Sequence, residues 1–199
     1  MSPLLERASE TLKIEIAGLE GLIERLDAEF EQAVNLLFAC QGKVILAGMG
    51  KSGLIAQKIA ATLTSTGTPS LFLHAGESSH GDLGIITRQD VVIVFSYSGE
   101  TSEVVQMIGH IHAIGVQLTA MTGKPNCTLA KAATVDLCID VEKEACPLGL
   151  TLTASSKATL ALGDALAMCV LELRKFREDD FAMFHPGGSL GRKLTIKIK

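Results

Sequence analysis

The sequence predicts an α/β fold in which a five-stranded parallel sheet is flanked by helices in a three-layer αβα arrangement. Short apolar runs alternate with helical patterns along the chain, which is typical of strand–helix–strand units. Apolar residues make up 47% of the chain but aromatic residues only 4%, so the core must consist mainly of Ala, Leu, Ile and Val. Such side chains suit closely packed parallel layers.

Length, charge and cysteine content limit the class of protein. A chain of 199 residues is expected to form a single domain with a sizeable core. Its 18 basic and 22 acidic residues give a net charge of −4 without a basic stripe, so we expect no nucleic-acid partner. No apolar run approaches the length that crosses a membrane, and no signal peptide opens the chain. The five cysteines include no CxxC pair and are expected to be free thiols in the cytoplasm.

The first part of the chain is expected to be a helical arm, residues 1–41. Apolar residues recur there at helical spacing, with a break near Asp27. Such an arm either packs on a partner subunit or covers one face of its own sheet, and the sequence leaves both alternatives open.

After the arm, strands and helices alternate. Strands are expected at residues 43–47, 71–73, 91–95, 116–121 and 137–140. Helical segments are expected at residues 52–65, 77–83, 100–114, 128–133, 153–175 and 179–184. Ligands of such sheets bind beyond the carboxyl ends of the strands, so the turns after the strands should form one rim.

The first of these turns, Gly48–Gly53, reads GMGKSG and leads from a strand into a helix. Unpaired backbone N–H groups and the helix dipole make such a turn suitable for an anion, most often a phosphate. Lys51 adds a charge and Ser52 a hydroxyl. The turn does not satisfy the Walker A pattern. Its GxGxxG match lacks an acidic residue after the next strand, where His74 stands, so nucleotide binding is a minor alternative.

A second turn of this kind, SYSGET at residues 96–101, follows the third strand. A single hydroxyl would only cap the following helix. Three hydroxyls at a second helix N-terminus, from Ser96, Ser98 and Thr101, are better explained as a phosphate cradle.

With both turns present, the chain resembles the sugar isomerase (SIS) domain, whose signature is GMGKS followed by S-x-S-G-E-T. The motifs HAGESSHGDLG, VEKEACPLGL, TLALGDALA and FHPGGSLGRKL make residues 43–194 similar to the arabinose-5-phosphate isomerases. The resemblance implies a flavodoxin- or Rossmann-like SIS fold and interconversion of D-ribulose 5-phosphate and D-arabinose 5-phosphate through an enediolate. It implies no required cofactor, a role in supplying Kdo for lipopolysaccharide or capsule, and a homotetramer or homodimer.

The resemblance also implies roles for individual residues. Phosphate-binding positions are Ser52, Ser96, Ser98 and Thr101. Positions relevant to catalysis are Lys51, Glu103, Glu144 and His185. Positions that line the substrate are Gly67, Thr68, His74 and His80. His74 also matches a position that contacts an inhibitory zinc. Because His185 lies far from the other motifs in sequence, it could enter the site of a neighbouring subunit.

Three departures from the family are visible. Family members usually continue into a pair of CBS domains, whereas this chain stops at Lys199, so regulation by that module is lost or the chain is truncated. The family usually has Asn where Tyr97 stands. A Ser/Thr-rich run of the family is replaced here by TASSK at residues 153–157.

Aldose–ketose isomerisation needs the residue types that these motifs supply. A carboxylate or imidazole moves a proton between neighbouring carbons, and a cation or hydrogen-bond donor stabilises the enediolate oxygens. Histidine suits the opening of the sugar ring. His74, His80 and His185 could alternatively bind a metal, although no HxH or HExxH spacing supports this. Two other functions stay open: a SIS isomerase for a hexulose or heptulose phosphate, and a non-catalytic sugar-phosphate sensor.

Overall fold

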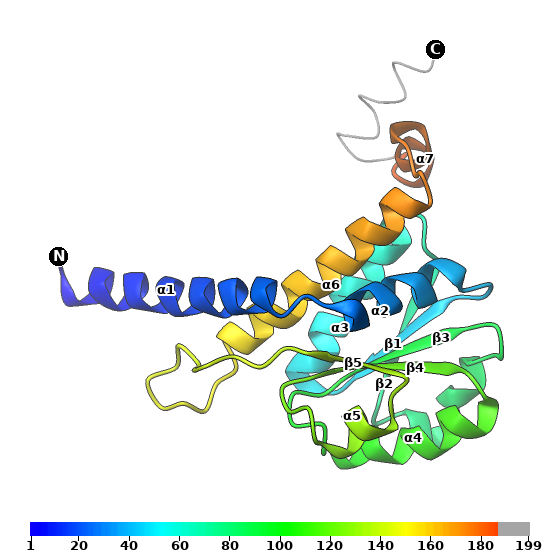
Figure 1. Ribbon diagram of the computed structural model, residues 1–199, viewed down its shortest axis with the longest axis horizontal. Coiled ribbons are helices and arrows are strands. Elements are labelled where there is room, and N and C mark those ends of the chain that lie inside the picture. Colours follow the sequence, from blue (N-terminus) through cyan, green and yellow to red (C-terminus); the bar gives the residue numbers. More distant parts are fainter. Residues whose placement is uncertain (187–199) are drawn as a thin grey trace.

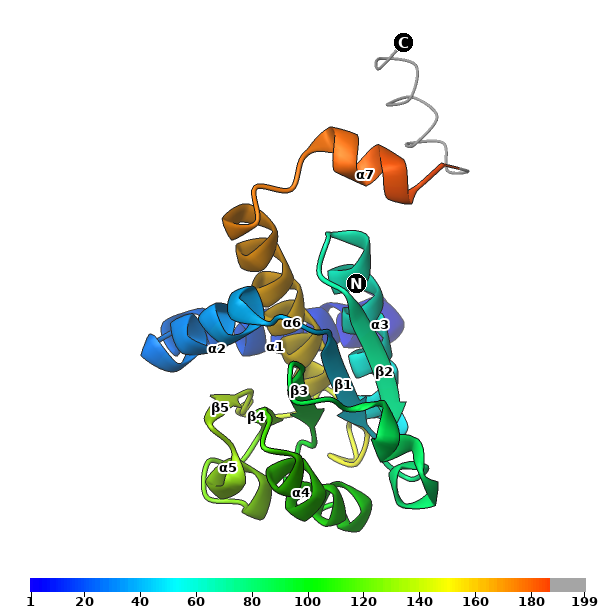
Figure 2. The same ribbon diagram turned by 90° about the vertical axis from the view of Figure 1, so that its right-hand side faces the viewer.

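A parallel sheet of five strands forms the middle layer of the protein, as the sequence predicts (Figures 1 and 2). The computed structural model describes residues 1–186. The strands are β1 (Val44–Gly48), β2 (Ser70–His74), β3 (Val91–Phe95), β4 (Gln117–Thr122) and β5 (Val135–Cys138). They lie in the order β2-β1-β3-β4-β5, and every neighbouring pair is parallel.

Helices cover both faces of this sheet (Figure 2). One face carries α1 (Pro3–Glu24), α2 (Ala28–Ala39), α3 (Gly50–Ser65) and α6 (Ala154–Leu173). The other carries α4 (Ser102–Ile114) and α5 (Thr128–Ala132). Two 3-10 turns, η1 (Ser78–His80) and η2 (Asp82–Ile85), connect β2 to β3, and α7 (Glu178–Phe184) follows α6.

The central strands are buried on both faces. Leu46 and Ile93 pack beneath α3 and α6, whereas Ile45 and Val92 pack beneath α4, and all four side chains are fully buried. This double burial explains why these strands read as continuous apolar runs rather than as alternating patterns.

The order in which strands are added to the sheet changes side at β1. β2 lies on one side of β1 and β3 on the other, so Gly48 is paired with His74 and also with Phe95. In doubly wound sheets of this strand order, ligands bind beyond the carboxyl ends at the point where the order changes side. The turns after β1 and β3 therefore lie side by side at the place where a ligand is expected.

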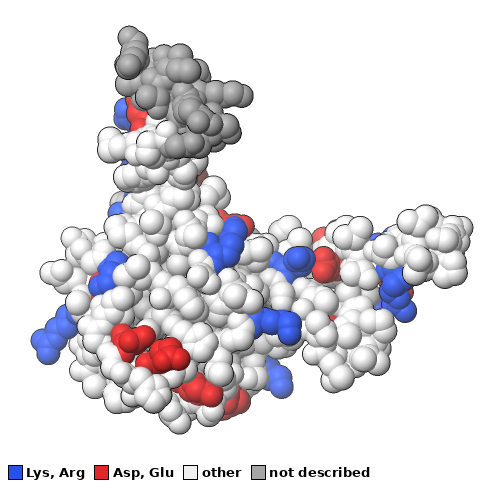
Figure 3. Space-filling model, turned by 180° about the vertical axis from the view of Figure 1, so that it is seen from behind, with Lys and Arg blue, Asp and Glu red and all other residues white. Residues whose placement is uncertain are grey.

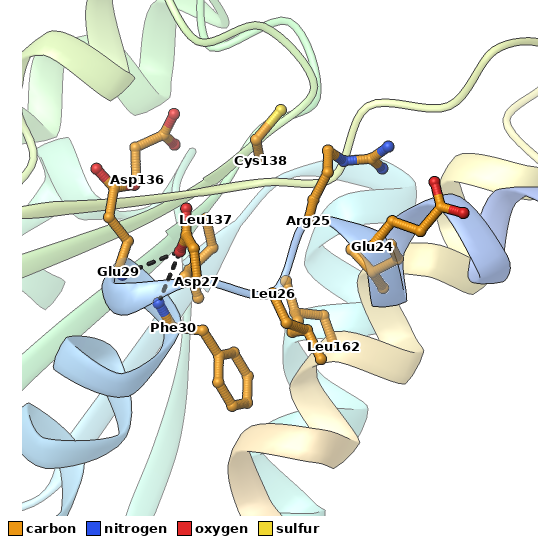
Figure 4. Close-up of a pocket in the computed structure, with 11 residues that line it drawn as sticks. Glu24, Arg25, Leu26, Asp27, Glu29, Phe30, Asp136, Leu137, Cys138 and Leu162 are labelled. Atoms are coloured by element: carbon orange, nitrogen blue, oxygen red, sulfur yellow. Dashed lines mark hydrogen bonds between the residues drawn. The ribbon is translucent and has the colours of Figure 1, made fainter.

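The N-terminal arm is two helices joined at the predicted break. The Asp27 carboxylate accepts hydrogen bonds from the N–H groups of Glu29 (2.9 Å) and Phe30 (3.3 Å), which begins α2 (Figure 4). α1 packs on α6 through its buried residues and extends beyond the sheet (Figure 1). Its outer face leaves large apolar side chains exposed, among them Leu4, Leu5, Leu12, Ile16 and Ile23.

Two expectations about these elements need correction. The strand expected at residues 137–140 is β5 at Val135–Cys138, an edge strand whose inward residues are Val135 and Leu137. Among the described helices, α6 is also long and apolar enough to cross a membrane, which the sequence analysis did not anticipate. Half of its apolar window is buried against the rest of the fold, and it packs on α1, α2 and α3 as a core helix does.

Candidate functional site

The turn from β1 into α3 depends on three glycines. A Cβ on Gly53 would lie 3.0 Å from the Gly48 carbonyl oxygen, so the strand end and the helix approach closely only because both residues lack side chains. Gly50 has a φ of 56°, a conformation that glycine adopts without strain. The helix begins there, two residues earlier than expected.

This tight turn leaves the N-terminus of α3 without a side-chain cap. Met49 occupies the N-cap position, and its side chain accepts no hydrogen bond from the first N–H groups of the helix. Within residues 1–186, no hydrogen bond engages the Lys51 ammonium or the Ser52 hydroxyl. The turn thus offers backbone N–H groups, a hydroxyl and a positive charge to an anion.

The turn from β3 into α4 presents hydroxyl groups beside it. The hydroxyls of Ser96 and Thr101 lie 3.1 Å apart, and Ser96 Oγ accepts a hydrogen bond from the Gly99 N–H at 3.1 Å. Ser98 Oγ accepts one from the Glu100 N–H at 3.2 Å. Thr101 is the N-cap of α4, but its side chain caps no helical N–H. A second uncapped helix N-terminus therefore stands next to that of α3.

The next two helices that begin at this edge are capped by carboxylates. Glu100 accepts hydrogen bonds from the N–H (2.7 Å) and hydroxyl (2.8 Å) of Thr128 at the start of α5. Glu144 accepts them from the N–H (2.6 Å) and hydroxyl (2.8 Å) of Thr153 and from the hydroxyl of Ser155 at the start of α6. An anion is thus favoured at α3 and α4, where the N-termini are uncapped, and disfavoured at α5 and α6.

Glu103, in the first turn of α4, lies near His74 at the end of β2. The Ser102 hydroxyl donates a hydrogen bond to Glu103 Oε2 at 2.7 Å. That bond, the Glu103 backbone N–H and the nearby His74 lower the pKa of the Glu103 carboxyl. His74 Nδ1 accepts a hydrogen bond from the Gly76 N–H at 3.2 Å, which leaves Nε2 for another partner. His80 is exposed in η1, which packs against α4.

Glu144 has a structural role that its sequence position did not reveal. Burial alone would raise the pKa of its carboxyl, but the hydrogen bonds from Ser155 and Thr153 outweigh burial and lower it. The carboxylates of Glu144 and Glu103 are therefore both held ionised.

Gly67 and Thr68 lie at the amino ends of the strands, opposite the ends at which the turns after β1 and β3 lie. They precede β2, and since a strand rises about 3.3 Å per residue, Ser70 at its start is roughly 13 Å from His74 at its end. Thr68 is buried, and its hydroxyl accepts a hydrogen bond from Arg174 Nε at 3.1 Å. Within a single chain, these two residues therefore lie far from the turns after β1 and β3.

His185 also lies away from those turns. It follows α7, stacks on Phe181 with 3.8 Å between ring centroids, and lies with Nδ1 2.9 Å from the Phe181 carbonyl oxygen. Together with Gly67 it lines a groove of about 750 Å³ beside α3 and β2. The rest of its motif, from residue 187, lies outside the described residues.

No metal centre joins the expected histidines. Within residues 1–186, no group of three or more His, Cys, Asp or Glu side chains is placed to hold a metal ion.

One further pocket lies outside this site. A pocket of about 300 Å³ between the α1–α2 junction and β5 is lined by Arg25, Asp27 and Asp136, among others (Figure 4). Burial raises the pKa of Asp136 to about 6, the Thr122 hydroxyl opposes that rise, and the Glu29 charge adds to it. On the face seen in Figure 3, Lys and Arg are scattered and form no stripe among the described residues.

Sequence analysis missed one pair at the site, Tyr97 and Asp140. The Tyr97 hydroxyl donates a hydrogen bond to Asp140 Oδ1 at 3.3 Å. The departure from the family at Tyr97 was visible, but no local pattern announces a contact between residues 43 positions apart.

Known proteins are similar to this chain in sequence and fold. Residues 37–169 match the SIS domain. Arabinose 5-phosphate isomerase KdsD of Salmonella typhi is 50% identical over 193 residues, 97% of this chain and 59% of that protein. The KdsD of Pseudomonas aeruginosa is 49% identical over 195 residues, 98% of this chain and 60% of that protein. The chain thus spans about 60% of the length of these relatives.

A solved structure shows the same likeness in three dimensions. A protein of Escherichia coli CFT073 in complex with arabinose 5-phosphate has a TM-score of 0.90 to this chain and is 40% identical to it. The match covers 94% of this chain and 100% of the other.

Proposed function

The chain belongs to the SIS-domain family, and we propose that it is an aldose–ketose isomerase that interconverts D-ribulose 5-phosphate and D-arabinose 5-phosphate. The curated relatives named above carry that activity in their names, and the solved relative is a complex with arabinose 5-phosphate. The arabinose 5-phosphate made by this protein would supply the synthesis of Kdo for lipopolysaccharide or capsule, and the reaction would take place in the cytoplasm.

One observation carries the proposal: the two uncapped helix N-termini meet beside β1 and β3. The N–H groups at the start of α3 and the hydroxyls of Ser52, Ser96, Ser98 and Thr101 would hold the phosphate. Because β1 lies between β2 and β3, a pentose anchored there extends its other end towards His74 and Glu103.

The residues at that end supply the groups that proton transfer requires. Glu103, held ionised, would move the proton between C1 and C2, and the Lys51 ammonium would stabilise the charge that develops on the enediolate oxygens. His74 and His80 would bind the sugar hydroxyls and assist ring opening. None of these steps requires a cofactor, and zinc at His74 would block its role.

His185 and Gly67 would complete the site of a second copy, whereas Thr68, which is buried and bonded to Arg174, would take no direct part in it. Within one chain His185 and Gly67 lie at the amino ends of the strands, and the groove that His185 lines is open to a partner. The exposed apolar face of α1 offers a further surface for packing of subunits in a homodimer or homotetramer. A mixture of E103Q and H185A chains tests this arrangement. Each variant alone should be inactive, whereas hybrid oligomers should regain activity, and the absence of recovery would argue for sites within single chains.

Isomerisation in heavy water tests the activity. Ribulose 5-phosphate is incubated with the protein, and product identity and deuterium at C1 or C2 are followed by NMR. Arabinose 5-phosphate carrying solvent deuterium is the expected result. Turnover of only a hexulose or heptulose phosphate would assign another SIS isomerase, and phosphate-dependent binding without turnover of any of these sugars would assign a sensor.

A further inference from the structure

Tyr97 occupies the middle of the β3–α4 turn, between two of the proposed phosphate ligands, Ser96 and Ser98. Its backbone carbonyl accepts a hydrogen bond from the Gly123 N–H at 2.9 Å. Its ring lies against Gly123, where an added Cβ would come within 2.4 Å of ring carbon Cε2. The ring is therefore held in place over the end of β4 by a residue without a side chain.

The other end of the Tyr97 side chain reaches the segment after β5. Its hydroxyl donates to Asp140 Oδ1 at 3.3 Å, and the Asp140 carbonyl oxygen accepts a 2.6 Å hydrogen bond from Arg25 Nη2. Burial raises the pKa of the Tyr97 phenol, the Val141 N–H opposes this, and the Asp140 and Glu144 charges raise it further. The phenol thus stays protonated at neutral pH and remains a donor to Asp140.

From this geometry we propose that Tyr97 is a positioning residue, whose hydroxyl bond to Asp140 fixes the β3–α4 turn in the conformation that holds a phosphate group. The inference rests on the proposed function and extends it to a residue that touches no reacting atom. Tyr97 and Ser98 also line a cavity of about 560 Å³ with Asp140, so the bridge runs along one wall of the space beside the phosphate ligands.

The Asn that the family usually carries here could not make the same bridge. An Asn side chain ends about one aromatic ring short of a tyrosine hydroxyl, so it would leave Asp140 unpaired. Without this bridge the turn is more mobile before binding, so it loses more conformational entropy when it orders around a phosphate. That cost weakens binding of the substrate and of the transition state equally.

Steady-state kinetics of Y97F, D140A and the double variant test the proposal. We expect each single change to raise KM for the pentose phosphate about three- to tenfold, as for one hydrogen bond, with kcat within about twofold. The double variant should be no worse than the more impaired single variant, because both remove the same bond. The matched control is D164A, which removes an exposed Asp paired with Lys58 elsewhere and should leave KM unchanged. Additive effects, or a fall in kcat at constant KM, would overturn the proposal.

Binding of inorganic phosphate separates this inference from the proposed activity. Calorimetry should show weaker phosphate binding by Y97F than by wild type even if no isomerisation is found, and equal binding would overturn the inference alone. Tyr97 is the only tyrosine and the chain has no tryptophan, so the ultraviolet absorbance of phenolate reports this residue alone. Its pKa should lie above 10 in wild type and fall in D140A, and an unchanged value would contradict the bridge.

Discussion

The hydroxyl oxygens of Ser96 and Thr101 lie 3.1 Å apart at the start of α4, next to the uncapped start of α3. Ser96 Oγ also accepts a hydrogen bond from the Gly99 N–H, so this buried side chain shapes the turn as well as lying beside the Thr101 hydroxyl. This pair of hydroxyls between two helix N-termini is the centre of the proposed phosphate site.

Removing the Thr101 hydroxyl should weaken the grip on phosphate. T101V keeps the shape of the side chain but loses a donor to a charged group, a loss worth about 1.5–3 kcal/mol, so KM should rise about ten- to a hundredfold. Steady-state kinetics measure this, and T62V in the last turn of α3 provides the matched control, since the Thr62 hydroxyl bonds the Lys58 carbonyl of its own helix. An unchanged KM in T101V would place the phosphate elsewhere.

The close approach of β1 and α3 predicts opposite effects for two Gly→Ala changes. G53A places a Cβ 3.0 Å from the Gly48 oxygen and should lower the free energy of unfolding by about 1–3 kcal/mol. G109A, inside α4 with open space around it, should raise that free energy by up to about 1 kcal/mol because alanine favours the helix. Urea unfolding measures both, and a G53A protein as stable as G109A would refute the tight turn.

Glu144 should contribute to stability as the cap of α6. E144A should lower the free energy of unfolding by about 1 kcal/mol, and E144Q should recover part of it because an amide oxygen still accepts hydrogen bonds. Since the folded pKa is lowered, this contribution is present above the ordinary value of 4.5 and is lost as the pH falls through the folded value. The control is E142Q at a nearby position on the same loop. Wild-type stability together with lost turnover in E144Q would instead make Glu144 a catalytic residue only.

Asp136 should make the protein less stable as the pH rises. Its folded pKa is about 6 against an ordinary 3.8, so the folded state holds its proton over a range in which the unfolded chain has released it. This stabilises the fold below about pH 4, and the gain is lost as the pH rises through 6. D136N should therefore have a higher melting temperature than wild type at neutral pH and the same melting temperature at low pH. A constant difference across the pH range would contradict the shift.

The sequence predicted the layers and the two strand-to-helix turns after β1 and β3 because both follow from local patterns. The continuous apolar runs VILA and VVIVF predict that β1 and β3 are buried on both faces. The glycines after β1 predict the tight turn there. Pairings over long sequence distances were not predictable. Glu144 capping α6 through Thr153 and Ser155, and Tyr97 reaching Asp140, depend on tertiary packing that no motif encodes. The sequence separation of His185 did suggest that it stands apart, and the fold places it on the far edge of the sheet.

A crystal structure of the protein with arabinose 5-phosphate tests the central claim most directly. The phosphate should lie within hydrogen-bond distance of the first N–H groups of α3 and of the hydroxyls of Ser96 and Thr101, with the carbon chain directed towards His74 and Glu103. A phosphate bound in the groove beside His185 of the same chain, or anywhere away from the starts of α3 and α4, would contradict it.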